Sequence, residues 1–412
     1  MKSTLALLVA LFFFAACAYA TGQTPTAVYT FICNGSAFLR IGNCPQGGRP
    51  DSLIQASNGN FYGAAQDSEE GSSAPNGGTV FSLTSAGKFT LLHTFTAGMN
   101  KNYPNGNLPG NLIQGPDGKL YGVTLYGGND GCNGYCGYGV IYRINTNGSD
   151  FQILHKFCSQ TGCADGYAGY FLATGNDGNI YGSTYYGGSN NGGTIFQIAP
   201  ATGAYKVVFN FDYSTSGEDP SALVAGPDGT FYGLSFSSTG GLLFHYTEST
   251  GVLTTAVLDF PLFNGLPSHG SDLTLGPNGN FYGLYIIYAE SGEGVFEVDL
   301  DGSNLQLFPF YTTVDGAGEP DGLLLGSDGN FWMANYNGNS YGSIIQLSPT
   351  NGSLMQTLTP FSSTAAVGAY PVALMQASDG TFWGTTDQFG NASNGHFGDG
   401  TVFGYDLGLP PR

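Results

Sequence analysis

The sequence has very little charge. Only 9% of its 412 residues are charged, and Lys and Arg together number 10 against 29 Asp and Glu. The formal net charge of −19 is therefore spread thinly over a surface rich in Asn, Ser, Thr and Gly. Nucleic acids and anionic lipids both bind basic faces, so we expect neither as a partner.

A long apolar run is also missing after the first twenty residues, so no transmembrane segment is expected. Those twenty residues have the parts of an export signal: Lys2, an apolar stretch over 5–16 and the small-x-small site Ala18-Tyr19-Ala20. Cleavage after Ala20 would make the formal charge one unit more negative and leave 21–412 secreted, extracellular or periplasmic. The alternative is that Phe14-Ala15-Ala16-Cys17 is a weak lipobox, which would attach a lipid to Cys17. The first residue of that motif is usually Leu, whereas it is Phe14 here. The C-terminal YDLGLPPR contains no sorting tail or anchor.

Cysteine is scarce as well, and six remain once the signal is removed, an even number in an exported chain. They form three neighbouring couples: Cys33 with Cys44, Cys132 with Cys136, and Cys158 with Cys163. Local disulfides are expected in an oxidising compartment, with an exchange of partners between the second and third couples left open. A metal site is disfavoured because CNGYC and CSQTGC lack the CxxC spacing and the histidines of zinc modules. We therefore predict no metal centre.

Glycine and aromatic residues are abundant, at 67 Gly and 14% Phe, Trp and Tyr, which is typical of all-β proteins with many tight turns. The segment GPDGTFYG (226–233) has near copies along the chain, about every 50 residues. Seven pairs mark them: Asn58-Gly59, Asp117-Gly118, Asp177-Gly178, Asp228-Gly229, Asn278-Gly279, Asp328-Gly329 and Asp379-Gly380. Such pairs accept the positive φ of a two-residue hairpin, so each predicts a turn between two strands.

The residues around each turn fall into columns. A Leu precedes every turn: Leu53, Leu112, Leu172, Leu223, Leu273, Leu323 and Leu374. An aromatic residue follows every turn: Tyr62, Tyr121, Tyr181, Tyr232, Tyr282, Trp332 and Trp383. A fourth strand ends in Phe six times: Phe95, Phe157, Phe211, Phe260, Phe310 and Phe361. The seventh copy stops after GTVFGYDL (400–407), and AVYTF (27–31) supplies its missing strand, with Phe31 in the Phe column.

Seven four-stranded units, the last completed by the N-terminal strand, predict an all-β, seven-bladed β-propeller that forms one domain over 21–412. The blades are expected near 51–95, 110–157, 170–211, 221–260, 271–310, 321–361 and 372–407. Closure of the seventh sheet by 27–31 removes an open edge strand. Because one ligand site rarely needs seven copies of a motif, we interpret the motif as architecture, with its aromatic residue between blades.

The repeat unit resembles that of the GloVer-repeat, or choice-of-anchor, tandem-repeat proteins exported by environmental bacteria. LIQGPDGKLYGVTLYGG (112–128) and GTVFSLTSAGKFTLLHTF (78–95) show the likeness, which covers the whole mature chain. The resemblance implies an exported propeller and no defined activity. A fainter similarity, of LLLGSDGNFWMA (323–334) to streptogramin-lyase propellers, concerns the scaffold and does not transfer a function.

In a propeller blade, the 2–3 loop and the connection to the next blade emerge on one face, and the 1–2 and 3–4 turns emerge on the other. The long segments of variable length belong to the first face, here called the variable face: 33–44, 66–78, 126–139 and 158–170. All three cysteine couples are expected there. A disulfide at such a loop lowers the ordering cost of ligand contacts, or protects an exported loop from proteases.

The variable face is also expected to collect aromatic residues. The predicted ligand-binding residues are Tyr126, Tyr138, Tyr185, Tyr186, Tyr288 and Tyr336, with Tyr135, Phe236 and Phe389 near them. Exposed rings beside Asn, Asp and Ser suit sugars, which have an apolar ring face and hydroxyl edges. The alternative is that these rings pack between blades.

Three of the five histidines fit the repeat. His93 and His155 share a strand-four column with other ring and apolar residues, and His245 lies in a polar strand-three row, so we interpret all three as structural.

The other two histidines depart from the repeat. His269 lies just before blade five and His396 in the 2–3 loop of blade seven, on the same face as Glu290 and Glu293. These four residues are the candidates for acid–base chemistry or a divalent metal. Because the two histidines are two blades apart, isolated surface residues are the favoured interpretation.

Two classes of function remain. We predict a monomeric, non-enzymatic binding or adhesion module for a polysaccharide or protein surface, because no convergent acid–base set is evident. The alternative is a streptogramin-lyase-like or polysaccharide-acting enzyme with its site at the channel mouth. No cofactor is predicted, since the acidic segments DLDGSN (299–304) and NDGCNG (129–134) lack a complete calcium-loop spacing, and calcium is left open as the alternative.

Overall fold

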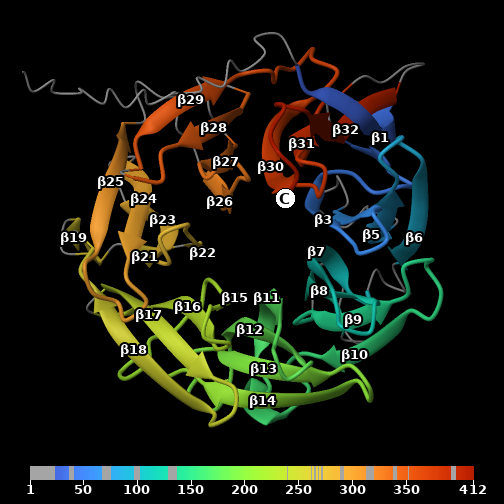
Figure 1. Ribbon diagram of the computed structural model, residues 1–412. Coiled ribbons are helices and arrows are strands. Elements are labelled where there is room, and N and C mark those ends of the chain that lie inside the picture. The colour runs from blue at the N-terminus through green and yellow to red at the C-terminus, as the bar shows by residue number, and fades with distance from the viewer. Residues whose placement is uncertain are drawn as a thin grey trace, which may run out of the picture.

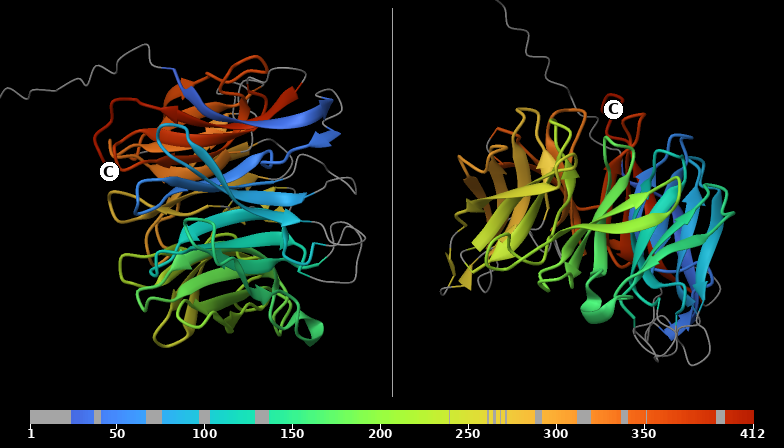
Figure 2. Two further views of the ribbon diagram at one scale, coloured as in Figure 1. Left: turned by 90° about the vertical axis from the view of Figure 1, so that its right-hand side faces the viewer. Right: turned by 90° about the horizontal axis from the view of Figure 1, so that it is seen from below.

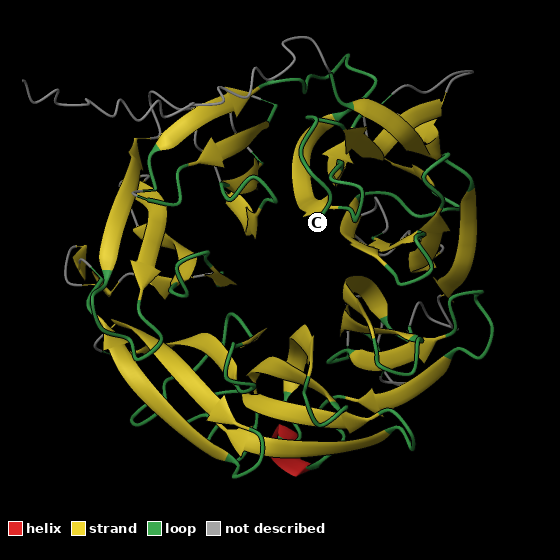
Figure 3. Ribbon diagram, viewed as in Figure 1, coloured by secondary structure: helices red, strands yellow, loops and turns green. Residues whose placement is uncertain are grey.

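The structure, a computed structural model, confirms the all-β fold (Figure 3). It describes residues 24–36, 41–66, 76–96, 103–128, 137–238, 240–260, 262–263, 266–267, 269–270, 272–287, 292–311, 320–336, 341–350, 352–390 and 396–412. Several expectations fall outside them: the export signal with Cys17, the couple of Cys132 and Cys136, and Tyr135, Tyr288 and Glu290. Within the described residues the only helix is one 3₁₀ turn, η2 (Thr161–Cys163).

Seven antiparallel sheets stand around a common axis as the blades of a propeller (Figure 1). Blades one to three consist of β3 (Pro50–Gln55), β4 (Phe61–Ala65), β5 (Asn76–Leu83) and β6 (Phe89–Thr96); β7 (Asn107–Gln114), β8 (Leu120–Tyr126), β9 (Val140–Ile144) and β10 (Gln152–Lys156); and β11 (Tyr167–Thr174), β12 (Ile180–Tyr186), β13 (Thr194–Ala199) and β14 (Ala204–Asn210). In each sheet the strands pair in chain order, from the inner strand to the outer strand.

The later blades repeat this order. Blade four consists of β15 (Val224–Ala225), β16 (Phe231–Ser237), β17 (Gly240–Thr247) and β18 (Val252–Leu258), and blade six of β26 (Pro320–Leu325), β27 (Phe331–Asn335), β28 (Ser343–Leu347) and β29 (Leu354–Leu358). In blade five the inner strand is divided into β21 (His269–Gly270) and β22 (Thr274–Leu275), which pair with β23 (Phe281–Ile287), followed by β24 (Gly292–Val298) and β25 (Gln306–Tyr311). A small hairpin of β19 (Leu262–Phe263) and β20 (Leu266–Pro267) precedes it.

The seventh blade is closed by the N-terminal strand, as predicted. It consists of β30 (Ala369–Gln376), β31 (Phe382–Gln388), β32 (His396–Tyr405) and β1 (Thr26–Ser36). β1 and β32 are antiparallel, from the pair Thr26 and Gly404 to the pair Asn34 and His396. β1 runs past the predicted 27–31 and pairs with β2 (Ile41–Asn43), which adds a fifth strand to the sheet.

The hydrophobic core is divided among the junctions between blades. Seven clusters of buried residues each combine side chains from two neighbouring blades. Within five of them, the aromatic residue after the turn contacts the first residue of the second strand in the next blade. These ring pairs are Tyr181–Phe231, Tyr232–Phe281, Tyr282–Phe331, Trp332–Phe382 and Trp383–Phe61, with centroids 4.0 to 4.9 Å apart. Large buried rings of this kind dominate core energetics.

The repeated turn is hydrogen-bonded to this core. In six blades, the Asn or Asp side chain of the turn bonds to the aromatic side chain four residues later. Tyr121 donates its hydroxyl to Asp117 Oδ2 at 2.9 Å, for example, and Trp332 donates Nε1–H to Asp328 Oδ1 at 3.2 Å. The fixed spacing between turn and aromatic residue therefore serves packing, and the architectural interpretation of the motif is confirmed.

The two faces of the ring differ. Figure 2 shows η2, which follows the outer strand of blade two, at one face and the C-terminus at the other. Ser327 Oγ donates to the carbonyl of Pro410 at 2.6 Å, so the C-terminal residues lie beside the 1–2 turn of blade six. Long connections thus stand on the variable face, and the short turns occupy the opposite face.

A left-handed backbone conformation recurs where an inner strand begins. Five non-glycine residues, here called the junction residues, have positive φ: Arg49 (48°), Leu108 (52°), Ala168 (56°), Asp219 (51°) and Tyr370 (59°). Four of them donate their N–H to a carbonyl of the preceding blade, as Asp219 does to Gly192 at 3.1 Å and Tyr370 to Tyr341 at 2.8 Å. Since this conformation costs a non-glycine residue about 1–2 kcal/mol, the bond to the neighbouring blade helps to hold it.

Candidate functional site

The structure brings three of the six predicted ligand-binding tyrosines together. They lie in one group of five rings on blades two and three, here called the tyrosine cluster: Tyr138, Tyr167, Tyr170, Tyr185 and Tyr186. Sequence reasoning missed Tyr167 and Tyr170. The available signal was Tyr170, an aromatic residue in a strand-one column that holds Asp51, Gly110 and Ser221 in other blades.

The five rings form a continuous series. Centroid separations are 5.1 Å for Tyr138 and Tyr167, 5.3 Å for Tyr167 and Tyr186, 6.1 Å for Tyr186 and Tyr185, and 5.5 Å for Tyr185 and Tyr170. Three of the residues are well exposed, Tyr138 at 40%, Tyr170 at 45% and Tyr186 at 44%. The cluster is therefore an aromatic surface open to solvent, unlike the buried rings between blades.

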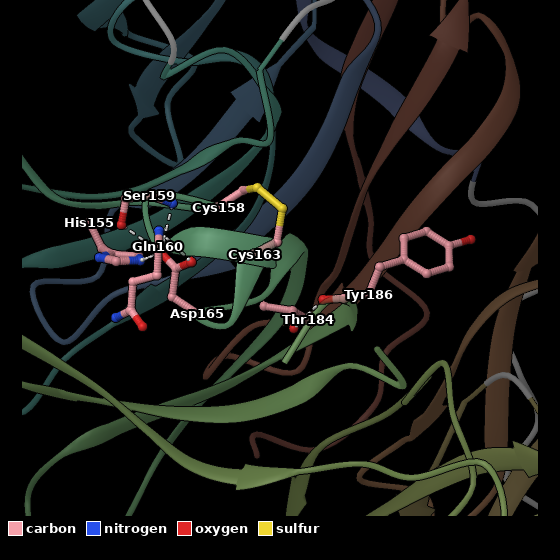
Figure 4. Close-up of a disulfide and its surroundings, with 8 residues drawn as sticks. All are labelled: His155, Cys158, Ser159, Gln160, Cys163, Asp165, Thr184 and Tyr186. Atoms are coloured by element: carbon pink, nitrogen blue, oxygen red, sulfur yellow. Dashed lines mark hydrogen bonds and ion pairs between the residues drawn. A yellow bond between two sulfur atoms is a disulfide. The ribbon is translucent and has the colours of Figure 1, made fainter. Parts of the chain in front are cut away.

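The segment 158–166 beside the cluster is organised around one buried carboxylate (Figure 4). Asp165 accepts hydrogen bonds from Ser159 N at 2.9 Å, Ser159 Oγ at 2.6 Å and Gln160 N at 3.1 Å, inside the turn closed by the Cys158–Cys163 disulfide. Burial alone would raise the pKa of the Asp165 carboxyl, but these hydrogen bonds hold it below its ordinary value. The carboxylate thus fixes the conformation of the turn.

The same segment is fastened to the strand that carries the tyrosines. The carbonyl of Cys163 accepts the N–H of Gly166 at 2.8 Å and the N–H of Gly188 at 2.9 Å. Tyr167, which follows Gly166, is the register partner of Tyr186. A Cβ at Gly166 would lie 2.4 Å from Thr184 Oγ1, so only glycine permits this close approach. The disulfide turn and two rings of the cluster therefore form one rigid unit.

The three histidines expected to be structural are confirmed as such. His155 stacks on Tyr205 with centroids 3.6 Å apart, and its Nε2 lies 2.9 Å from Asp165 Oδ2. Burial lowers the pKa of His155, and Asp165 opposes this effect without cancelling it. His93 stacks on Phe151 at 3.6 Å, and His245 stacks on Tyr232 at 4.5 Å.

Two acidic residues stand next to the tyrosine cluster. Burial, followed by the charge of Asp219, raises the pKa of Tyr185 to about 12, and the charge of Asp219 is the main cause of a raised pKa at Tyr186. Glu218 also acts on Tyr186. Burial and the neighbouring Glu218 raise the pKa of Asp219 itself to about 6. The electrostatic environment of these rings is therefore negative.

The cluster also reaches the central cavity of the ring, which has a volume of about 660 Å³. Tyr170 and Tyr185 line this cavity together with inner-strand residues of several blades, including the carboxylates of Asp51 and Asp272. Burial raises the pKa of Asp51 to about 6 and also raises that of Asp272, whose Oδ2 accepts the N–H of Leu323. The cavity is therefore acidic and closely adjoins the aromatic surface.

The remaining predicted tyrosines lie elsewhere. Tyr126 is the half-buried last residue of β8. Tyr336 is part of a network at blades six, seven and one, in which its hydroxyl donates to Asp387 Oδ2 at 2.9 Å and Arg49 Nε lies 2.6 Å from Asp387 Oδ1. Tyr370 packs on Tyr336 with centroids 5.1 Å apart. Because Asp387 is only 4% exposed, this network joins blades at the seam of the ring.

The acid–base candidates are only partly brought together. His269 in β21 and Glu293 in β24 are both register partners of Ile286 in β23, so they belong to the same sheet of blade five with β23 between them. His396 belongs to β32 of blade seven, in a different sheet.

Two of the three predicted disulfides lie within the described residues, and both are confirmed: Cys33–Cys44 and Cys158–Cys163. The third was predicted between Cys132 and Cys136. Neither of these two cysteines belongs to the described residues, so the structure does not bear this disulfide out and it stays a prediction. An exchange of partners between the second and third couples is excluded, because Cys158 is bonded to Cys163.

One group of side chains has the spacing of a metal site. Cys33, Cys44 and the buried Asp399 bring potential metal-ligand atoms within 4.8 Å of one another. This group does not fit a metal ion, because the disulfide leaves no thiolate to bind one.

Within the described part of the chain, no helix has the length and apolar character needed to cross a membrane.

Comparisons with known proteins agree with the fold. A family model described as the Gloeobacter/Verrucomicrobia repeat matches residues 13–235, more than half of the chain. The search of curated proteins found no match to this chain. The periplasmic gluconolactonase of Pseudomonas aeruginosa is 15% identical, with a TM-score of 0.54 over 80% of this chain and 95% of that one. A protein from Lactobacillus plantarum is 17% identical, with a TM-score of 0.51 over 75% and 84%. At such identities these structures share the propeller fold alone, whereas the family match is direct: the chain belongs to the Gloeobacter/Verrucomicrobia repeat family.

Proposed function

We propose that the protein is a non-enzymatic, exported binding module that takes up a polysaccharide on its tyrosine cluster. The observation that carries this proposal is the exposure of three tyrosines, each at 40% or more, within a continuous series of five rings. A monomeric protein has no packing reason to keep several large rings in solvent side by side. The apolar face and hydroxyl edge of a sugar match such a surface.

The rigidity of the site supports binding. The disulfide turn and the hydrogen bonds to Cys163 O hold Tyr167 and Tyr186 in place before a ligand arrives. A preorganised surface loses less conformational entropy on binding, which favours affinity. Disulfides are typical of an oxidising compartment, so we place the protein in the periplasm or outside the cell.

The test is a glycan-array screen of residues 21–412, with and without calcium, followed by affinity measurement for each hit. Tyr186→Ala is expected to weaken binding about tenfold, since an aromatic contact is worth about 0.5–1.5 kcal/mol. Tyr213→Ala is the matched control, because Tyr213 is also 44% exposed and belongs to no ring pair among the described residues. Sugar binding that survives Tyr186→Ala would contradict this placement of the site, and binding to proteins alone would contradict the ligand class.

An enzymatic function is the second candidate, supported by the register that places His269 and Glu293 opposite the same residue of β23, one on each side of that strand. It predicts turnover of a bound glycan or lactone that is lost in His269→Ala. Product analysis by mass spectrometry after incubation with each array hit distinguishes the two, because a binding module returns its ligand unchanged.

A further inference from the structure

Building on the proposed glycan-binding function, we propose that the tyrosine cluster selects a cationic sugar, a glucosamine polymer with free amino groups, because Asp219 and Glu218 set negative charge against its rings. The structure contains three independent features that point this way. They are the missing partner of Asp219, the electron-rich faces of the tyrosines, and the backbone position from which Asp219 projects.

The carboxylate of Asp219 is half-buried and has no hydrogen-bond or ion-pair partner among the described residues. Its backbone N–H is used, in the bond to the carbonyl of Gly192. Burying an unpaired carboxylate is unfavourable, so a cation supplied by a ligand would relieve a penalty that the free protein bears. Glu218, the preceding residue, adds a second negative charge.

Two of the three basic side chains within 137–238 lie on parts of blades two and three away from the tyrosine cluster. This described range contains three, Arg143, Lys156 and Lys206. Arg143 donates to the carbonyl of Pro200 and to Gln152, and Lys206 lies on the outer strand of blade three, where it pairs in register with Gln197. With a net charge of −19, the rest of the chain does not compensate. The local field therefore favours a positive ligand.

The tyrosine rings add to this preference. A cation over the face of a tyrosine ring gains about 0.5–1 kcal/mol at an exposed site. The backbone places Asp219 beside these rings: its N–H bonds to the carbonyl of Gly192, and Gly192 forms a β-bridge with Gly187, the residue after Tyr186. In agreement with this placement, the charge of Asp219 acts on both Tyr185 and Tyr186. A series of five rings suits successive sugar rings of a polymer, whereas a single lysine side chain would use one ring only.

Asp219 is also one of the five junction residues, whose backbone conformation is shared while the side chain varies. The other four are Arg49, Leu108, Ala168 and Tyr370. Among these five described junction residues, Asp219 is therefore the only acidic one. Glycine would adopt this conformation without strain. The conformation itself belongs to the architecture, and the acidic side chain is what distinguishes this junction from the other four.

The experiment is calorimetric titration of the mature protein at pH 7 with tetraglucosamine and with its fully N-acetylated counterpart. The two ligands have the same rings and differ in charge. We expect tetraglucosamine to bind about tenfold more tightly, and the difference to shrink with added salt. Asp219→Asn is expected to abolish the preference while retaining the fold, because Asn tolerates a left-handed conformation.

The matched control is Asp212→Asn, which removes the same charge from the same connection. The exposed Asp212 carboxylate bonds to Ser214 N at 2.9 Å, a contact that Asn can keep, and it has no described contact with the cluster. The preference should survive this change.

The outcomes separate this inference from the proposed function. Equal binding of both sugars, or a preference that persists in Asp219→Asn and Glu218→Gln, would overturn charge selection and leave glycan binding intact. Binding of neither sugar would overturn both. Oligolysine that binds as tightly as tetraglucosamine and is lost in the same variants would overturn the sugar class.

Discussion

At the scale of single residues, one column of the outer strands shows how burial determines protonation. Tyr29, His93, His155, Phe209 and Phe308 occupy equivalent positions. The repeat predicted that these residues are structural, because a position shared by most blades serves packing. It could not predict their different electrostatics: His155 meets the carboxylate of Asp165, whereas His93 Nε2 is buried without a hydrogen-bond partner among the described residues.

His93 predicts a pH-dependent term in stability. Burial lowers its pKa to about 4, against about 6.5 in an unfolded chain. Between these values the unfolded state binds the proton more tightly, so the contribution is complete above pH 6.5 and is lost as the pH falls toward 4. His93→Phe, which copies Phe209, should therefore narrow the difference between the melting temperatures at pH 7 and pH 4.5.

Two measurements check this prediction. Differential scanning calorimetry gives the melting temperatures, and an NMR titration should show no protonation of His93 above pH 5. A gap in melting temperature that is unchanged in His93→Phe would mean that other groups cause the acid sensitivity.

The same scale explains why the candidate site was only partly predictable. Tyr138, Tyr185 and Tyr186 stand out because they lie beyond the repeated columns. Tyr167 and Tyr170 lie in β11, although the sequence assigned 158–170 to a connection on the variable face, and the predicted binding residues were taken mainly from the segments that follow strand two. Asp219 gave no signal, because its environment depends on rings that lie more than thirty residues earlier in the chain and on a backbone conformation that its residue type does not reveal.

At the scale of elements, the start of the inner strand is the least predictable part of the repeat. Asx-Gly turns and aromatic columns are visible in the sequence, since each requires particular residue types. The left-handed junction residues are not, because Arg, Leu, Ala, Asp and Tyr share no preference for positive φ. At four of the five, a bond to the carbonyl of the preceding blade helps to hold the conformation instead. The division of strand one in blade five was likewise invisible in the sequence.

Ala168 allows a direct test of this junction strain. At its φ of 56°, Ala168→Gly relieves a cost of about 1–2 kcal/mol, part of which is offset by the greater freedom of glycine in the unfolded chain. The variant is expected to be more stable by about 0.5–1 kcal/mol. Denaturant unfolding measures the change.

Ala204→Gly is the matched control, since Ala204 is an exposed residue of β14 without positive φ. Glycine there should destabilise the protein by about 0.5–1 kcal/mol. If Ala168→Gly and Ala204→Gly both lowered the free energy of unfolding, the junction conformation would store no strain.

At the scale of the whole molecule, the seven-fold repeat and the strand missing from its last copy made the architecture predictable. Each blade buries its apolar surface only against its neighbours, as the seven junction clusters show. A ring of this kind has no preferred starting point. The break between the termini therefore lies within blade seven, between β32 and β1, at a place equivalent to an ordinary 3–4 turn elsewhere.

This equivalence predicts that the chain can be opened in another blade. In the circular permutant, Tyr405 is joined to Pro25 through a copy of the turn 84–88, which links β5 to β6, and new termini are placed between Ala201 and Thr202 in the exposed 3–4 turn of blade three. We expect the permutant to fold, with a melting temperature within about 5 °C of the parent, because six junctions are kept whole and the junction of blades six and seven loses only the partly buried Leu407 and Leu409. Deletion of β1 is the control, and it should aggregate or lose cooperative unfolding, since β32 becomes an open edge. Circular dichroism and calorimetry measure both; a permutant that fails to fold, or a deletion that melts like the parent, would show that closure by β1 does not complete an otherwise uniform ring.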